Sequence, residues 1–330
     1  MSEGQGTVGI DIGTMNLISA VSNPSDGSIK TKSLRNVFLE VSKASDGTID
    51  LAKVYHTVID GIIYVLSGDA YKFANIFNKE ISRPMKTGLL NPAFLDSSEI
   101  LGTMIRDLVG KNTNGDVCAF SVPAPSVDHE NDIVYHRGMI QKIIKSLGYK
   151  PLAVNEGAAV IFSECPVDKT GIGISFGAGM TNVAVVYQGM PGMTFSIARG
   201  GDWIDHSTSR SLNGLDSRIT AIKESGFDIN DARVGTKRER KIREAISLYY
   251  AELVEYVINN IIIQLTNTEI ELPVSLPIVL SGGTCKAKGF TTMVKNILDG
   301  YELPFEVSEV RRATEPLEAV AKGCLAQALK

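Results

Sequence analysis

Apolar and polar positions alternate along this chain in a pattern that divides it into short strands and longer helices. Residues 7–12 form an apolar run that ends at a glycine turn, and residues 17–22 follow as the returning strand, which predicts a β-hairpin. Strands predicted at 171–176, 183–187 and 194–198 repeat this pattern half a chain later. The repetition predicts internal duplication of an α/β unit with mixed sheets.

Helical spacing of apolar residues predicts helices over 97–109, 128–147, 204–212, 237–266 and 316–329, and another that begins near Glu156. Ser97 and Ser98 are expected to cap the first helix, and Gly148 to follow the end of the second. Further strands are predicted at 116–122, 151–154 and 277–281. Parallel strands with crossover helices place ligands at the carboxyl ends of the strands.

The stretch from residue 25 to about residue 80 is more polar and irregular than its surroundings. Short strands at 37–41 and 54–56 and a helix at 57–66 are predicted there. We interpret this stretch as a small subdomain inserted into the first half.

The length, charge and apolar content of the chain limit the classes of protein to which it can belong. The chain has 330 residues, 44% of them hydrophobic, a length that favours about two domains. A net charge of −4 gives no indication of a nucleic-acid partner. No secretory signal and no run of 18 apolar residues is found, so we expect a cytoplasmic protein without a direct membrane anchor.

Cysteine and histidine spacing argues against a metal centre built from these residues. The four cysteines are far apart and the histidines are not clustered, which is typical of free thiols in a reducing compartment and of structural histidines. These residues are Cys118, Cys165, Cys285, Cys324, His56, His129, His136 and His206.

Two glycine turns carry the candidate chemistry. GIDIGTMN spans 9–16 and GISFGAGMTN spans 173–182, so that Asp11 and Ser175 correspond at a separation of 164 positions. Such a turn after a strand presents several backbone N–H groups in one direction, which suits a phosphate group. Asp11 interrupts an apolar strand, which is costly unless it is paired or solvated. Facing a nucleotide, it could hold a hydrated Mg²⁺, while Thr14 and Asn16 donate to phosphate oxygens.

Five segments in order resemble the five-motif signature of the actin superfamily of ATPases: 9–16, 154–162 (VNEGAAVIF), 173–186, 278–290 (IVLSGGTCKAKGF) and 315–324 (EPLEAVAKGC). They resemble the first phosphate loop, the first connecting motif, the second phosphate loop, the adenosine motif and the second connecting motif, and they span nearly the whole chain. RPMKTGLL at 83–90 and GGDWID at 200–205 resemble segments of the bacterial actin MreB. The resemblance is therefore to bacterial actins of the MreB and MamK type.

This resemblance implies an actin-like (ribonuclease-H-like, duplicated) α/β fold with two domains, four subdomains and an interdomain nucleotide cleft. The first core domain would comprise 1–33, 81–151 and 312–330, with 34–80 as its small inserted subdomain. The second core domain would comprise 152–198 and 259–311, with 199–258 as an inserted helical subdomain.

The resemblance also implies roles for individual residues. Asp11 would hold Mg²⁺ through water and so belong to the catalytic set with Glu156, which would position the attacking water. Glu156 has a plainer explanation as well, because an acid in the first turn of a helix is favoured by the helix dipole. The implied nucleotide-binding residues are Gly13, Thr14, Met15, Asn16, Gly177, Ala178, Gly179, Met180, Gly201, Asp202, Gly282, Gly283 and Thr284.

The second phosphate loop departs from the pattern of the superfamily. Ser175 and Asn182 stand where that pattern has acidic residues. Loss of a carboxylate weakens the field that retains Mg²⁺. We therefore expect nucleotide binding to survive and hydrolysis to be slowed by on the order of 10²-fold.

The resulting functional hypothesis is a nucleotide-binding bacterial actin homologue that polymerises into cytoskeletal filaments with ATP or ADP and Mg²⁺, GTP being the alternative nucleotide. Its partners would be further copies of itself and an adaptor or cargo protein. Three other hypotheses use the same core: a non-polymerising chaperone-like or assembly ATPase, a sugar or acid kinase, and a scaffold without ATPase activity.

Overall fold

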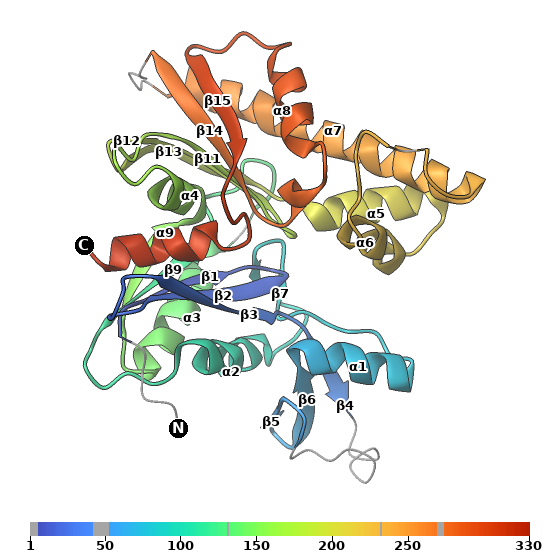
Figure 1. Ribbon diagram of the computed structural model, residues 1–330. Helices are drawn as coiled ribbons and strands as arrows, with labels where there is room; N and C mark the ends of the chain where they lie inside the picture. Colours follow the sequence, from blue (N-terminus) through green and yellow to red (C-terminus); the bar gives the residue numbers. More distant parts are fainter. Residues whose placement is uncertain (1–5, 42–52, 131, 232, 269–273) are drawn as a thin grey trace. The chain divides into compact units, whose positions relative to one another are not determined.

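The computed structural model describes residues 6–41, 53–130, 132–231, 233–268 and 274–330. The chain divides into two compact units (Figure 1). The first comprises Met1–Val122, Asn131–Val154 and Cys324–Lys330, and the second Pro123–Glu130 and Asn155–Gly323. Each unit is built around one five-stranded sheet.

The sheet of the first unit has the strand order β10-β9-β1-β2-β3. Strand β1 pairs antiparallel with β2 and parallel with β9, and β2 pairs antiparallel with β3. The strand bounds are Val8–Ile12 (β1), Asn16–Ser22 (β2), Ile29–Arg35 (β3), Val117–Val122 (β9) and Lys150–Asn155 (β10).

The sheet of the second unit repeats this arrangement, with the order β13-β12-β11-β14-β15. Strand β11 pairs antiparallel with β12 and parallel with β14, and β12 pairs antiparallel with β13. The bounds are Gly171–Phe176 (β11), Thr181–Tyr187 (β12), Met190–Ile197 (β13), Ser275–Ser281 (β14) and Glu306–Arg312 (β15). The shared strand order confirms the predicted duplication.

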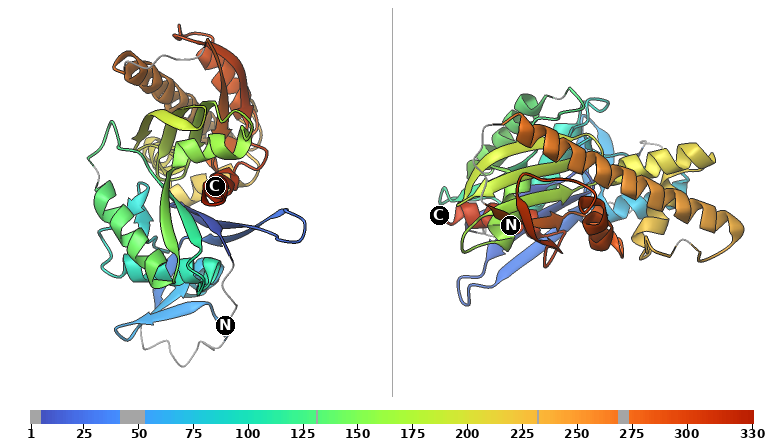
Figure 2. Two further views of the ribbon diagram at one scale, coloured as in Figure 1. Left: turned by 90° about the vertical axis from the view of Figure 1, so that its left-hand side faces the viewer. Right: turned by 90° about the horizontal axis from the view of Figure 1, so that it is seen from above.

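Helices cover the sheets. In the second unit α4 lies on one face of the sheet, and α7 and α8 lie on the other (Figure 1). Figure 2 (right) shows α7 running along this sheet and continuing past it to α5 and α6. The bounds are Glu156–Glu164 (α4), Gly201–Leu212 (α5), Asp216–Glu224 (α6), Lys237–Thr266 (α7), Thr284–Lys286 (η3), Phe290–Leu298 (α8) and Ala319–Ala328 (α9).

In the first unit, α2 and α3 pack against the main sheet, and α1 packs against a small second sheet with the order β4-β6-β5. A two-stranded hairpin, β7-β8, follows α1. The bounds are Ser67–Phe77 (α1), Ser97–Val109 (α2), Ile133–Ser146 (α3), Phe38–Val41 (β4), His56–Ile59 (β5), Ile62–Leu66 (β6), Met85–Lys86 (β7) and Leu89–Leu90 (β8).

The helix predicted at 57–66 is wrong, because these residues form the β5-β6 hairpin. Its turn consists of Asp60 and Gly61, whose φ angles are 48° and 78°. An Asp-Gly pair with both residues at positive φ is the preferred two-residue turn of a hairpin. The strand predicted at 54–56 therefore begins later, at His56, and the helix of this region is α1. Strand β3 was not predicted either.

The predicted caps of α2 are also wrong. Asp96 is the N-cap residue, but its side chain makes no capping hydrogen bond, and the Ser97 hydroxyl donates to the carbonyl oxygen of Asn91. The helix predicted from residue 128 begins at Ile133, where the Asp132 carboxylate accepts from the backbone N–H of Tyr135. Helices α6 and α8 and strand β15 were not predicted.

Helix α7 is long and apolar enough, by length and composition, to cross a membrane. Its apolar residues have another explanation, because one face of it packs in the core of the second unit. The core residues of this face include Ile246, Tyr250, Val254 and Ile258.

We expect Gly148→Ala to lower the free energy of unfolding by about 2 kcal/mol or more. Gly148 follows α3 with φ of +89°, and an added Cβ would lie 1.9 Å from the carbonyl oxygen of Asn112. The matched control is Gly138→Ala, inside α3, where an added Cβ meets nothing within 4 Å. This control should raise the free energy of unfolding by about 0.5–1 kcal/mol. Urea denaturation measures both, and equal stabilities would contradict the structure.

Candidate functional site

The turn between β1 and β2 is closed by one backbone hydrogen bond. The N–H of Gly13 donates to the carbonyl oxygen of Asn16 at 3.1 Å. A Cβ at Gly13 would lie 2.8 Å from that same oxygen, so a side chain there would require the turn to open.

The turn between β11 and β12 has the same construction. The N–H of Gly177 donates to the carbonyl oxygen of Met180 at 3.0 Å, and a Cβ at Gly177 would lie 2.8 Å from that oxygen. Both residues of this bond are 164 positions beyond their counterparts in the first turn, Gly13 and Asn16. The two glycine turns are therefore the same structure, present once in each unit.

Two neighbours hold the first turn in place. Asn36, fully buried, donates from its side-chain amide to the carbonyl oxygen of Gly13 at 2.9 Å and from its backbone N–H to that of Met15 at 2.9 Å. The backbone N–H of Gly88, between β7 and β8, donates to the hydroxyl of Thr14 at 3.0 Å. The Thr14 hydroxyl can still donate a hydrogen bond to another acceptor. Asn36 was not singled out from the sequence, whereas Gly88 lies in the RPMKTGLL segment.

The β7-β8 hairpin is itself anchored by a buried histidine. The backbone N–H of Leu90 donates to His136 Nδ1 at 3.2 Å. Because Nδ1 accepts, the ring is neutral with its proton on Nε2. Burial lowers the pKa of His136 to about 4. His136 is therefore structural, as the sequence indicated, and supports the hairpin that contacts Thr14.

Asp11 lies on the opposite face of β1 from Ile10 and Ile12, which pack in the core. The Ser121 hydroxyl donates to Asp11 Oδ1 at 2.9 Å and accepts from the backbone N–H of Ile12. Burial raises the pKa of Asp11 to about 6, although the Ser121 hydrogen bond lowers it.

No ion pair to Asp11 is formed by any residue that the structure describes. Nor do the described residues contain a group of three or more His, Cys, Asp or Glu that could hold a metal ion. A lone buried carboxylate fits a cation that keeps most of its waters, as Mg²⁺ does, better than a metal held by a full set of protein ligands.

Glu156, the first residue of α4, is held through both of its carboxylate oxygens. Oε1 accepts from the Ser175 hydroxyl at 2.7 Å, and Oε2 accepts from the Asn182 side-chain amide at 2.9 Å. Ser175 and Asn182 lie directly opposite each other in the β11-β12 pair. Since side chains alternate along a strand, Ile174 and Phe176 face the core while Ser175 faces α4.

Helix α4 lies very close to the second sheet. A Cβ at Gly173 would lie 2.1 Å from the carbonyl oxygen of Gly157, and a Cβ at Gly157 would lie 2.7 Å from the backbone nitrogen of Ala184. At the start of the helix, the Asn155 side chain accepts from the backbone N–H of Ala158 at 3.0 Å. This cap and the two glycines set the position of Glu156.

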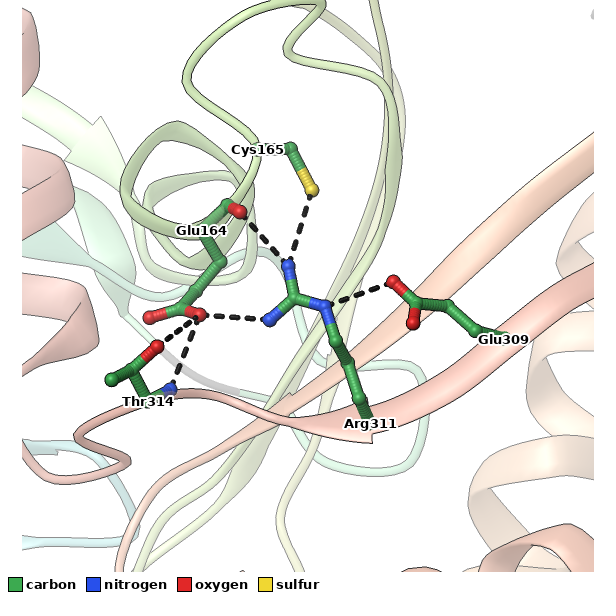
Figure 3. A network of polar contacts seen from close by, with 5 residues as sticks. All are labelled: Glu164, Cys165, Glu309, Arg311 and Thr314. Atoms are coloured by element: carbon green, nitrogen blue, oxygen red, sulfur yellow. Dashed lines mark hydrogen bonds and ion pairs between the residues drawn. The ribbon is translucent and has the colours of Figure 1, made fainter.

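The other end of α4 is anchored by a polar network (Figure 3). Arg311 of β15 donates from Nη1 to Glu164 Oε2 at 2.8 Å and from Nη2 to the Glu164 carbonyl oxygen at 2.8 Å. The backbone N–H and hydroxyl of Thr314 both donate to the same carboxylate oxygen at 3.2 Å. The Glu164 side chain is only 8% exposed, so these donors compensate its burial.

The adenosine-motif residues lie beside the second turn. A Cβ at Gly282, whose φ is +91°, would lie 2.2 Å from the carbonyl oxygen of Phe176, so only glycine fits there. The hydroxyl of Thr284 donates to the carbonyl oxygen of Gly177 at 2.9 Å. Gly283, between these two residues, is exposed.

The start of α5 joins the same cluster. The backbone N–H of Gly201 donates to the carbonyl oxygen of Gly177, and that of Asp202 to the carbonyl oxygen of Ala178. Lys223 of α6 donates to the Gly201 carbonyl oxygen at 2.6 Å and forms an ion pair with Asp205 at 2.8 Å. Lys223 was missed from the sequence, where no motif distinguishes it from other helix lysines.

The residues singled out from the sequence thus form two groups, one in each unit. The first unit brings together the four residues of the first turn and the carboxylate before it: Asp11, Gly13, Thr14, Met15 and Asn16. The second unit brings together the second turn and its neighbours: Glu156, Gly177, Ala178, Gly179, Met180, Gly201, Asp202, Gly282, Gly283 and Thr284.

Known proteins resemble this chain in family and in fold. The family model called Volactin matches residues 7–328. A search among curated proteins found no match.

Solved structures match the whole chain. A MamK double helical filament is similar at a TM-score of 0.72 with 19% identity, covering 99% of both chains. MreB 5 of Spiroplasma citri bound to AMPPNP is similar at 0.67 with 15% identity, covering 98% of this chain and 95% of that one. The ethanolamine utilization protein EutJ from Carboxydothermus hydrogenoformans is similar at 0.55 with 17% identity, covering 97% and 88%. The expected actin-like fold is confirmed.

We expect the structural role of His136 to make the protein sensitive to acid. The pKa of His136 is about 4 in the folded chain, below the ordinary histidine pKa of 6.5, so protons bind preferentially to the unfolded chain between these values. Stability from this group is complete above pH 6.5 and is lost as pH falls toward 4, by about 3 kcal/mol in all.

His136→Asn should remove this part of the pH dependence, as measured by urea denaturation at a series of pH values. His129→Asn is the control, because His129 is exposed and should leave the acid sensitivity as it is. Identical pH profiles for the wild type and His136→Asn would contradict the assignment.

Proposed function

The chain belongs to the Volactin family, and from this membership and its two matched glycine turns we propose that it binds an adenine nucleotide with Mg²⁺ and polymerises into filaments. The observation that carries the proposal is the Gly13–Asn16 hydrogen bond and its counterpart Gly177–Met180. Each closes a turn at the end of a buried strand, where backbone N–H groups suit a phosphate. Each unit therefore carries one turn that is equipped to bind a phosphate group.

Two of the similar structures support the proposal. MreB 5 of Spiroplasma citri was solved with AMPPNP, and the MamK structure is a double helical filament. Both share the fold of this chain over nearly its whole length. Self-association is accordingly proposed for this chain too, with an adaptor or cargo protein as a further partner and the cytoplasm as its location.

In this proposal the turn residues bind the phosphates. Gly13, Thr14, Met15 and Asn16 do so from the first unit, and Gly177, Ala178, Gly179 and Met180 from the second. Gly282, Gly283 and Thr284 approach the adenosine, and Gly201 and Asp202 lie beside them. Mg²⁺, held by Asp11 through water, would neutralise phosphate charge. GTP in place of ATP would be distinguished by competition binding.

Glu156 is the proposed positioning group for the attacking water. Ser175 offers a hydroxyl rather than a second carboxylate, so the site has a weaker field for Mg²⁺ and the proposed hydrolysis is slow. A weak ATPase would leave the nucleotide bound for a long time in each copy.

We expect Asp11→Asn to weaken nucleotide binding while raising the stability of the nucleotide-free protein. Because burial raises the pKa of Asp11 to about 6, the nucleotide-free protein contains a costly buried charge above that pH. The variant should therefore melt at a higher temperature than the wild type near pH 8 without ligand. Its affinity for ATP with Mg²⁺, measured by calorimetry, should fall about 10-fold or more.

Asp107→Asn is the control, since Asp107 lies on the surface in an exposed ion pair with Lys32. It should change neither quantity. Unchanged ATP affinity in Asp11→Asn would overturn the assigned metal role.

Electron microscopy of the purified protein with ATP and Mg²⁺ tests polymerisation. We expect filaments with ATP and Mg²⁺, and none when EDTA removes the metal. Phosphate release should be on the order of 10²-fold slower than that of MreB 5 measured beside it. Absence of filaments, with ATP still bound and no ATP-dependent sedimentation, would favour the non-polymerising chaperone-like ATPase instead.

A further inference from the structure

Ser175 and Asn182, the two residues that depart from the superfamily pattern in the second phosphate loop, both contact the carboxylate of Glu156. Ser175 and Asn182 are separated by seven residues in the chain but lie opposite each other across β11 and β12. Their side chains are 2% and 0% exposed, and each donates a hydrogen bond to a different oxygen of Glu156. We call this pair of donors the Glu156 clamp.

Both residues of the clamp can donate to the half-buried carboxylate of Glu156. A hydroxyl and a side-chain amide can donate, whereas an ionised Asp or Glu at either position can only accept. An acid at 175 or 182 would set a second carboxylate against Glu156, with like charges about 3 Å apart and a hydrogen bond lost. Two neutral donors therefore suit the negative charge of the Glu156 carboxylate, whereas an acid at either position would repel it.

The orientation of Asn182 is fixed from its other side. Its Oδ1 accepts from the backbone N–H of Ala124 at 3.1 Å, which leaves Nδ2 directed at Glu156. Ala124 is held in turn, because the Ser196 hydroxyl donates to its carbonyl oxygen at 2.8 Å. Neither oxygen of Glu156 can turn away without breaking one of these bonds.

Among the described residues of the first unit, the corresponding strand pair carries no such donors to a helix carboxylate. At the position that corresponds to Asn182 it has Ile18, which lies opposite Asp11 in the β1-β2 pair. Its buried acid stands on the strand itself, with one donor from Ser121. The two units thus differ. In the first unit the carboxylate, Asp11, lies on the strand itself. In the second unit the strand residues donate to a carboxylate, Glu156, that lies on helix α4.

We infer that Ser175 and Asn182 are positioning residues that hold the Glu156 carboxylate in one orientation, so that the second half of the site works without an acid that coordinates the metal. This inference rests on the proposed function. With a donor on each oxygen, the Glu156 carboxylate is held in one orientation and can still accept a hydrogen bond from water.

The test is Asn182→Asp, which has nearly the same shape, keeps the acceptor for Ala124 and removes the donor. We expect kcat for ATP hydrolysis near pH 8 to fall about 10-fold or more, with the ATP dissociation constant changed less than about 3-fold. As pH falls toward about 5.5, one acid of the new pair takes up a proton and can donate again. The loss of kcat should therefore shrink at low pH.

Asn112→Asp is the matched control. Asn112 is also buried and donates to a carboxylate, Asp116, at 2.6 Å, and it lies in neither turn. The substitution creates the same kind of acid pair elsewhere, so it should lower the melting temperature at high pH. It should leave the pH profile of kcat unchanged.

A charge exchange tests the clamp without any activity. In the double variant Glu156→Gln with Asn182→Asp, the amide and the carboxylate trade places and the hydrogen bond can form again. Its melting temperature near pH 8, without nucleotide, should return to within about 2 °C of that of Glu156→Gln alone.

The outcomes separate the two levels of the proposal. If Asn182→Asp binds ATP and shows the kcat and pH profile of the wild type, the clamp is overturned and the proposed function stands. If the wild type does not bind ATP, the proposed function is overturned, and the charge exchange still decides whether the clamp exists. A double variant that melts as low as Asn182→Asp overturns the clamp in either case.

Discussion

The position of α4 against the second sheet is the constraint on which the candidate site depends. The helix approaches so closely that Gly157 and Gly173 have no room for a Cβ between them. Helix α9 also lies close to α4, since an added Cβ at Gly323 would lie 1.8 Å from the carbonyl oxygen of Ala159. Contacts of this kind are set by hard atomic overlap rather than by attraction, so the helix has one available depth. Because Glu156 begins this helix, that depth brings its carboxylate within hydrogen-bonding distance of the sheet.

Electrostatics then distinguishes the two halves of a duplicated fold. Each half carries a half-buried carboxylate near its glycine turn. Among the described residues, the Ser121 hydroxyl donates to Asp11, and burial still raises the pKa of Asp11. Glu156 has a donor on each oxygen. The first carboxylate is suited to a cation, and the second is held by the protein without one.

The same difference connects structure to the proposed activity. In the proposed function, binding depends on backbone groups in the two turns, which are closed by the same hydrogen bond. In the proposed function, hydrolysis depends on how the Glu156 carboxylate is held toward water, and that depends on its neighbours. Ser175 and Asn182 supply these neighbours in the second unit. Slow hydrolysis would leave the nucleotide bound for a long time.

The sequence by itself determined the duplication, the two glycine turns and most core helices. The helices and strands follow from local periodicity, and the turns follow from glycines at positions where a side chain would not fit. Helix α2 and helix α7 begin and end where the spacing predicted. Only the tertiary structure decided the contacts between residues distant in the chain. Asn182 was recognised as a departure from a pattern, but its contact with Glu156 spans 26 positions. Lys223 and Asn36 carried no signal at all, since a lysine in a helix or an asparagine after a strand is ordinary until folding places a backbone carbonyl beside it.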